Sequence, residues 1–212
     1  MSPKDAATLL VETTIAMHQS GTPLMRRVLP LETEPTLWEH YPETDAISPN
    51  NGSRYFYHCH PVEERGAGEH GHFHLFLPKL VMEQTNVARC TPIDLAVDRA
   101  NIVHIVALSV SPEGLPISMF TVNRWVCDEW LFSQSDIMSV IDGFDLTDAE
   151  GDPLVNSWLT AMVHLAKPVI DTLLAERDAR LSAVNWDGED RALEVVSSAP
   201  IDLQSLVDPY LD

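Results

Sequence analysis

The chain has 212 residues, of which 32 are acidic and 13 are Lys or Arg, so its formal net charge at pH 7 is −19. Nucleic acids and anionic membrane surfaces are bound through clustered Lys and Arg, and this charge therefore argues against both as partners. The length predicts a single domain over residues 1–212. The three cysteines are too few and too widely spaced for a disulfide framework, and no apolar run approaches the roughly 20 residues of a membrane span. We therefore predict a cytoplasmic protein.

Residues 1–21 predict an N-terminal helix. Ser2 can cap this helix, Pro3 suits its first position and Gly21 can end it. The start lacks the basic stretch and apolar run of a signal peptide, so none is expected. Residues 30–53 are rich in Pro and turn residues and predict an irregular segment. In that segment Trp38 is interpreted as an anchor for the loop rather than as a platform for a substrate. His40 could reach the histidines of residues 54–78, but nothing in the sequence fixes its direction.

Residues 54–78 hold five of the nine histidines of the chain: His58, His60, His70, His72 and His74. Aromatic and aliphatic residues alternate with histidines over residues 55–60 and 72–77, a pattern typical of strands. The glycine-rich residues 61–71 between them predict a loop. Side chains two residues apart share one face of a strand, so each strand presents two histidines on one face.

The two strands are expected to pair as an antiparallel hairpin. Paired residue numbers that sum to 132 would place His58 opposite His74 and His60 opposite His72, and any even sum keeps all four rings on one face. Opposite Cβ atoms would then lie ~5 Å apart and neighbours along a strand ~7 Å apart. Both spacings suit imidazoles that share an ion through bonds of ~2.1 Å. The hairpin therefore predicts a metal site.

The loop of this hairpin adds polar groups to the site. His70 could be a further ligand, and Glu69 a ligand, a hydrogen-bond acceptor for an imidazole N–H, or a base. Two other interpretations of the histidines stay open, a hydrogen-bonded cluster without metal and a chance or adventitious grouping. The interleaved aromatic residues indicate a strand packed inside a fold, which favours the metal site.

A second hairpin is predicted over residues 102–126, with a turn at Ser111–Gly114. His104 lies in its apolar first arm and is interpreted as a core residue rather than a ligand. Arg124, at the end of the second arm, could hold an anionic ligand or form a structural ion pair. Residues 80–100, before this hairpin, predict a short amphipathic piece and a turn.

Residues 153–181 predict one long helix that is kinked at Pro168, and His164 on it is expected to hydrogen-bond in the core. Residues 185–212 predict a turn, a strand near residues 193–197 and a short helix. With residues 54–126 as an antiparallel sheet of about four to five strands, the fold class is α+β.

Three stretches resemble a bacterial domain family that has no assigned function: HCHPVEERGAGEHGHFHLF, TVNRWV and NSWLTAMVHLAKPVIDTLLAERDAR. The resemblance covers most of residues 37–181 and implies a soluble single-domain protein, but it implies no activity. A match to the cupins is poor, since they place a glutamate a few residues after an HxH pair and Leu75 to Pro78 follow here.

The leading hypothesis is a metalloprotein whose hairpin histidines hold a divalent first-row metal, iron, zinc or manganese, and which acts on a small molecule by oxygenase-type or hydrolytic chemistry. Glu69 or Glu64 would carry protons, and Arg65 or Arg124 would hold an anionic substrate. One alternative is a non-catalytic module that binds or delivers metal or haem. Another is a metal-free interaction protein that responds to pH through its histidines. Under each of these hypotheses the chain could form an oligomer.

Overall fold

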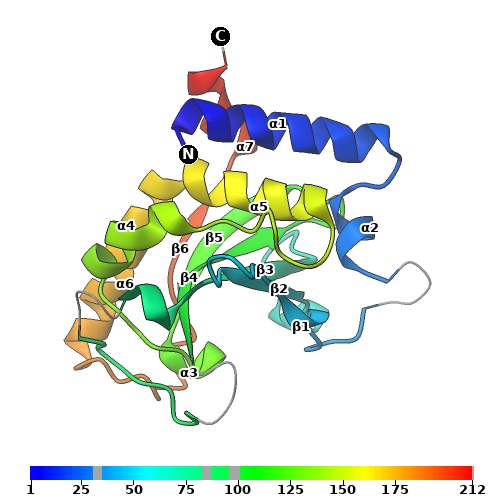
Figure 1. Ribbon diagram of the computed structural model, residues 1–212. Helices are drawn as coiled ribbons and strands as arrows, with labels where there is room; N and C mark the ends of the chain where they lie inside the picture. The colour runs from blue at the N-terminus through cyan, green and yellow to red at the C-terminus, as the bar shows by residue number, and fades with distance from the viewer. Residues whose placement is uncertain (31–34, 83–86, 96–100, 212) are drawn as a thin grey trace.

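The computed structural model describes residues 1–30, 35–82, 87–95 and 101–211. Six strands form one antiparallel sheet in which each strand pairs with the next along the chain (Figure 1). The fold class is α+β, with one strand more than the four to five expected. The strands are β1 (Tyr41–Ile47), β2 (Arg54–His58), β3 (Gly71–Pro78), β4 (Ile102–Val110), β5 (Pro116–Val122) and β6 (Val195–Pro200).

The two edge strands lie outside the predicted range 54–126. β1 runs through the segment expected to be irregular, where Pro42 hides the strand pattern because proline donates no hydrogen bond. As an edge strand, β1 tolerates this residue, and its pairing with β2 is interrupted between Tyr41 and Ala46. β6 pairs with β5 and begins two residues after the predicted start of the C-terminal strand.

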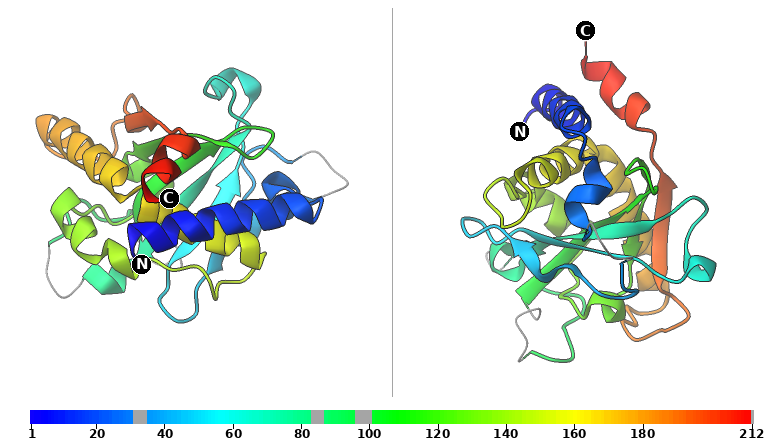
Figure 2. Two further views of the ribbon diagram at one scale, coloured as in Figure 1. Left: turned by 90° about the horizontal axis from the view of Figure 1, so that it is seen from above. Right: turned by 90° about the vertical axis from the view of Figure 1, so that its right-hand side faces the viewer.

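Three long helices lie on one side of the sheet, as Figure 1 and the right-hand view in Figure 2 show. They are α1 (Pro3–Gln19), α5 (Pro153–Leu165) and α6 (Lys167–Ala183), and α1 packs on α5. Their apolar residues share one core cluster with Phe73, Leu75 and Leu77 of β3. Ser2 caps α1 by accepting a hydrogen bond from the N–H of Asp5, as expected.

The single helix predicted over residues 153–181 is two helices. Ala166 separates α5 from α6 and caps both helices, and Pro168 lies in the first turn of α6. A proline in a first turn costs little because the N–H it lacks would have no partner inside the helix. The residue predicted to kink one helix therefore starts a second one. His164, on α5, hydrogen-bonds the carbonyl oxygen of Phe144 in the core, as expected (2.9 Å).

Short elements complete the chain. The remaining α-helices are α2 (Leu24–Val28), α3 (Arg124–Cys127), α4 (Gln134–Val140) and α7 (Leu203–Val207). Turns of 3-10 helix span Val62–Glu64, Lys79–Met82, Ile141–Gly143 and Asp208–Tyr210. The predicted turn at Ser111–Gly114 is present, but β5 ends at Val122 because Asn123 caps α3. Within the predicted 80–100 segment, residues 83–86 and 96–100 lie outside the described ranges.

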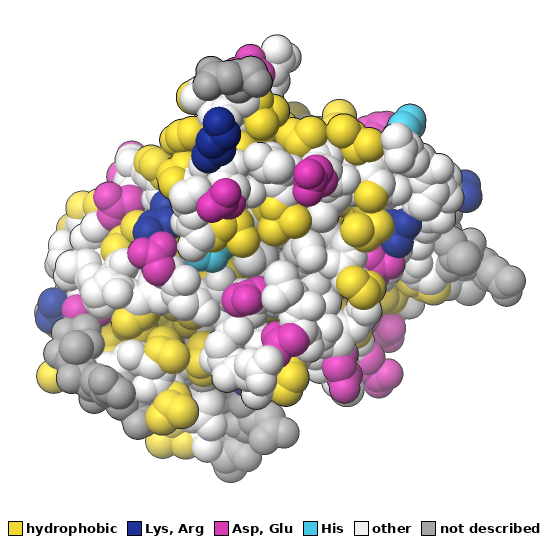
Figure 3. Space-filling view, turned by 45° about the horizontal axis from the view of Figure 1, so that its top comes forward, with side chains coloured by type: hydrophobic (Ala, Val, Ile, Leu, Met, Phe, Trp, Pro, Cys, Tyr) yellow, Lys and Arg dark blue, Asp and Glu magenta, His cyan; other side chains and the backbone are white. Residues whose placement is uncertain are grey.

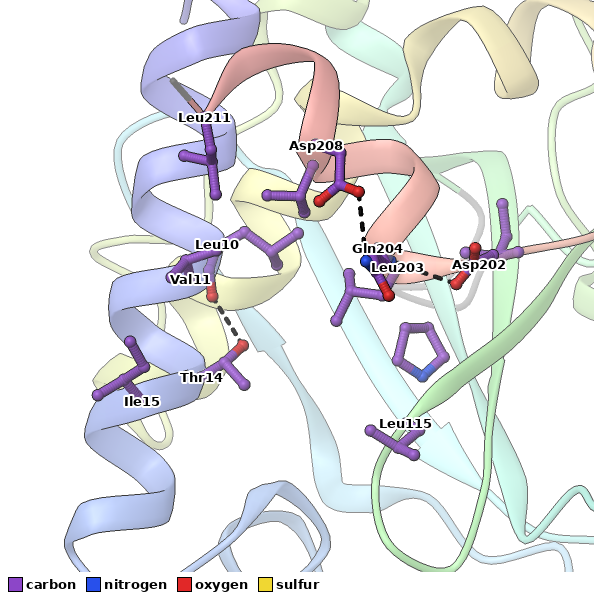
Figure 4. A pocket seen from close by; sticks show the side chains of 13 residues that line it. Leu10, Val11, Thr14, Ile15, Leu115, Asp202, Leu203, Gln204, Asp208 and Leu211 are labelled. Carbon is purple, nitrogen blue, oxygen red and sulfur yellow. Dashed lines mark hydrogen bonds between the residues drawn. The ribbon is translucent and has the colours of Figure 1, made fainter.

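On the helix-covered side, α1 and α7 border an open apolar groove of about 540 Å³, to which Leu10, Val11 and Leu203 contribute (Figure 4). Hydrophobic side chains lie among acidic ones on the surface shown in Figure 3. No helix in the described part of the chain is long and apolar enough to cross a membrane. The other face of the sheet carries α3 and several loops, and His58, His72 and His74 lie on it.

Candidate metal centre

The histidine hairpin forms with a register different from the predicted one. Residue numbers paired between β2 and β3 sum to 130, so His58 lies opposite His72, and His74 lies opposite Phe56. The predicted sum of 132 is therefore wrong. His60 also has no partner on β3, because β2 ends at His58. The sum is still even, and the paired histidines therefore share the face opposite the long helices.

Three buried histidines come close enough to bind one ion. His58, His72 and His74 each offer a ring nitrogen, and these nitrogens all lie within 4.8 Å of one another. The Nε2 atoms of His58 and His72 are 2.8 Å apart. Nitrogens bound to one ion at ~2.1 Å are separated by ~3.0 Å at right angles and ~3.4 Å at a tetrahedral angle. The cluster is therefore compatible with metal binding.

His60 joins this group from the loop rather than from the strand. Its Nε2 lies 3.3 Å from Nε2 of His58, a separation that fits a shared ion equally well. Its ring packs against Trp38, with 4.1 Å between the ring centroids. Trp38 is half exposed and has a φ of +68°, an unusual value for a residue of this size. Loop residues thus hold a fourth imidazole beside the buried three.

Two of these rings have a carboxylate next to Nδ1, the nitrogen on the side away from the cluster. Glu69 Oε1 lies 2.6 Å from Nδ1 of His72 and accepts a hydrogen bond from it, so Nε2 of that ring directs its lone pair toward the cluster. Burial raises the pKa of Glu69, but hydrogen bonds from His72 and the Gly66 N–H outweigh it and hold the pKa below its usual value. Glu64 lies 3.7 Å from Nδ1 of His60. Of the roles predicted for Glu69, the geometry favours the hydrogen-bond acceptor.

A third imidazole is held by another histidine. Nδ1 of His74 lies 3.0 Å from Nε2 of His104, and both rings are almost fully buried. The backbone N–H of His104 donates to Glu129, whose other carboxylate oxygen has no partner among the described residues. His104 was interpreted as a core residue, and it is one, but it also contacts a candidate ligand.

Burial keeps His58, His60 and His74 neutral at pH 7. Desolvation, reinforced by His72 and His60, lowers the pKa of His58 to about 2. Desolvation and His72 likewise lower the pKa of His60 to about 4, and burial holds the pKa of His74 well below its usual value. Only a neutral imidazole has a lone pair for a metal ion. A metal would therefore meet little competition from protons.

The cluster forms one end of a cavity of about 500 Å³ between the sheet and the loops. The cavity is also lined by Arg65 and Glu64 of the hairpin loop, by Ser109 and Ser118 of the sheet, and by Trp125 of α3. A smaller cavity of about 240 Å³ lies against His58 and His74 and includes Cys127. A molecule in the larger cavity would have access to an ion held by the histidines.

Two residues predicted for the site lie elsewhere. The Tyr57 hydroxyl group and Nδ1 of His70 are 2.6 Å apart, and Tyr57 belongs to the core on the helix-covered face. His70 is therefore placed away from the three-histidine cluster. Arg124 is buried, forms ion pairs with Asp128 and Glu189, and does not line the cavity. The structural alternative for Arg124 accounts for these contacts.

Two aromatic rings whose place was open from the sequence, those of His40 and Trp38, border the site. His40 stacks on Phe56, with 3.6 Å between ring centroids, and its ring centroid is 5.8 Å from that of His58. Trp38, interpreted as a loop anchor rather than a substrate platform, lines the same cavity as His40. The segment from residue 37 to residue 41, LWEHY, held the signal, since aromatic residues gathered there in an otherwise polar stretch.

Comparison with known proteins agrees with the resemblance found in the sequence. A family model described as a domain of unknown function, DUF6969, matches residues 4–201. The chain belongs to the DUF6969 family. The match extends beyond residues 37–181 on both sides and takes in α1 and all six strands of this DUF6969 member. No curated protein and no solved structure matches the chain.

Proposed function

We propose that the protein is a metal-dependent enzyme that binds one divalent first-row ion through His58, His72 and His74 and acts on a small molecule in the adjoining cavity. The convergence of three buried imidazoles is the observation that carries this proposal. Iron, zinc and manganese all accept such ligands. Three protein ligands leave positions for water or substrate, as catalytic sites require.

The neighbouring residues suit a hydrolytic or oxygenase-type reaction. Glu69 orients His72, whereas Glu64 is half exposed at the cavity and is the better proton carrier. An ion with an open position would activate water or dioxygen beside it. The role given to Glu64 rests on its place next to His60, within reach of a molecule that occupies the cavity.

Elemental analysis of protein purified without an affinity tag tests the metal site. We expect about one ion per chain after loading with Fe(II), Zn(II) or Mn(II), and loss of that ion in His58→Ala and His72→Ala. His18→Ala is the matched control, because His18 is exposed in the last turn of α1. Failure of all three metals to bind stoichiometrically, or full retention in the His58 and His72 variants, would refute the proposal.

A non-catalytic metal-binding module is the second candidate, and the position of His60 favours it. If His60 joins the other three rings, four imidazoles fill a tetrahedral ion, as in structural or storage sites. Relaxation of bulk water protons by bound Mn(II) separates the two functions. An enzyme has exchangeable water on the ion and gives strong relaxation, whereas a filled site gives weak relaxation that increases in His60→Ala.

The pH-sensitive interaction protein has less support. Its switch would have to titrate near the ordinary histidine pKa of about 6.5. Burial instead lowers the pKa values of His58, His60 and His104 to between about 2 and about 4. These three rings therefore keep one charge state across the physiological range.

A further inference from the structure

The floor of the cavity continues from the histidines across the sheet. His72 pairs with Ser109 on β4, and Ser109 pairs with Ser118 on β5. Adjacent strands are ~4.8 Å apart, so this row carries hydroxyl groups as far as ~10 Å from the histidine strand. The described residues give neither serine side chain a hydrogen-bond partner, and both face the cavity. The floor therefore offers polar groups to a bound molecule.

Apolar and aromatic groups flank this row. The ring of Phe120 lies 5.0 Å from that of His72, nearly perpendicular to it. Val122, Trp125 and Val126 continue the wall from Phe120. A flat apolar body lying over the serines would contact these side chains, since aromatic side chains favour stacked or edge-on contacts.

One side chain supplies the positive charge that lines the cavity. Arg65 is the one Lys or Arg among the described residues that line the cavity, although the chain as a whole is strongly acidic. Its Nε donates to the carbonyl oxygen of His60 (2.5 Å), and no ion pair joins it to a described carboxylate. The remaining guanidinium N–H groups are available for an anion beside the metal ligands.

The acidic groups nearby limit the charge of that anion. Glu69 accepts a hydrogen bond from His72 and keeps its negative charge, and Glu64 and the exposed Glu194 also line the cavity. One guanidinium and one divalent ion beside these carboxylates suit a single negative charge better than the two charges of a phosphate monoester. Planar bidentate recognition by Arg also fits a carboxylate.

We propose that the ligand of this cavity is a small organic monocarboxylate with a flat apolar body and a polar substituent. Its carboxylate binds between the metal ion and Arg65, its body lies along Phe120 and Trp125, and its substituent meets Ser109 or Ser118. This inference rests on the proposed function, because the metal supplies half of the carboxylate site.

Calorimetric titration with 4-hydroxybenzoate tests the inference on the metal-loaded full chain. Neutral 4-hydroxybenzamide is the matched probe, since it keeps the ring and hydroxyl group but removes the charge. We expect the carboxylate to bind at least about tenfold more tightly than the amide, a difference that corresponds to about 1.4 kcal/mol. Arg65→Gln should remove most of that preference, and Arg26→Gln, on the exposed side of α2, should leave it unchanged.

Ser118→Val tests the placement of the body, because the added methyl groups enter the floor on β5, two strands away from β3 and its candidate ligands. It should weaken 4-hydroxybenzoate binding at least tenfold without loss of metal. Stoichiometric metal with no preference for the carboxylate, no detectable probe binding, or binding indifferent to Arg65→Gln and Ser118→Val would overturn the inference and leave the metal site standing. Protein that takes up no metal refutes the proposed function itself.

Discussion

At the scale of single residues, the pairing of Glu69 with His72 makes the first prediction. Glu69→Gln keeps the shape of the side chain but replaces the charged acceptor of the His72 Nδ1–H with a neutral one. Loss of such a partner costs ~10–100-fold in metal affinity. Competition against a chromogenic chelator measures the affinity.

Glu63→Gln is the control for this measurement, because Glu63 is exposed in the same loop. Equal affinities for the Glu69 and Glu63 variants would show that the carboxylate does not orient the ring. The metal site would then depend on the imidazoles alone.

Glu129 makes a second prediction, about stability and pH. Burial raises its pKa to about 8, against the lowering effects of the His104 N–H, Arg177 and Arg124. The unfolded chain releases this proton near the ordinary value of 4.5, so between pH 4.5 and 8 the folded state binds more protons. The stabilisation from the protonated group is complete below pH 4.5 and is lost as the pH rises through 8.

Glu129→Gln cannot ionise and keeps an acceptor for the His104 N–H. Between pH 6 and 9 the urea midpoint of the unmodified protein should therefore decrease more than that of the variant. The buried histidines contribute equally to both proteins, so the difference isolates Glu129. Glu176→Gln, at an exposed site on α6, should follow the unmodified protein. Parallel curves for Glu129→Gln and the unmodified protein would contradict this assignment.

At the scale of elements, the start of β3 sets the spacing of the histidine hairpin. A Cβ on Gly71 would collide with the His58 carbonyl oxygen and the Tyr57 hydroxyl group across the hairpin. Gly71→Ala should therefore separate β2 from β3 next to the His58–His72 pair, with an overpacking cost of about 1–3 kcal/mol. Metal affinity should decrease together with the unfolding free energy.

Gly143→Ala provides the comparison for this variant, since a Cβ there meets nothing within 4 Å and the backbone has no positive φ. It should change neither stability nor metal binding. If Gly71→Ala behaves like Gly143→Ala, the close approach of the two strands is not what fixes the cluster.

The same hairpin shows how far the sequence can predict a site. Alternation of side chains fixed the shared face of His58, His72 and His74, because every even register preserves it. It could not select the register or show that β2 stops at His58. Nor could alternation find His104, which reaches the cluster through a third strand, or β1, whose Pro42 resembles a loop residue.

At the scale of the whole molecule, the placement of the cluster between β2 and β3 ties metal binding to folding. The three imidazoles converge only when the sheet forms, so the ion should bind the native state far better than the unfolded chain. The strongly acidic chain also favours cations near its surface. Metal binding should therefore appear as increased stability of the entire fold.

The fourth prediction uses this linkage. If the metal binds only the native state, a free metal concentration of 100 times Kd raises the free energy of unfolding by about 2.7 kcal/mol. For a domain of this size that corresponds to an increase in Tm of roughly 5–10 °C. Thermal unfolding followed by circular dichroism across a Zn(II) or Mn(II) series measures this increase in Tm, which should follow the logarithm of the free metal concentration.

The double variant His58→Ala/His72→Ala should show no such increase, because it keeps the acidic surface but lacks two of the three ligands. An equal increase in that variant would assign the stabilisation to nonspecific binding by surface carboxylates rather than to the histidine centre.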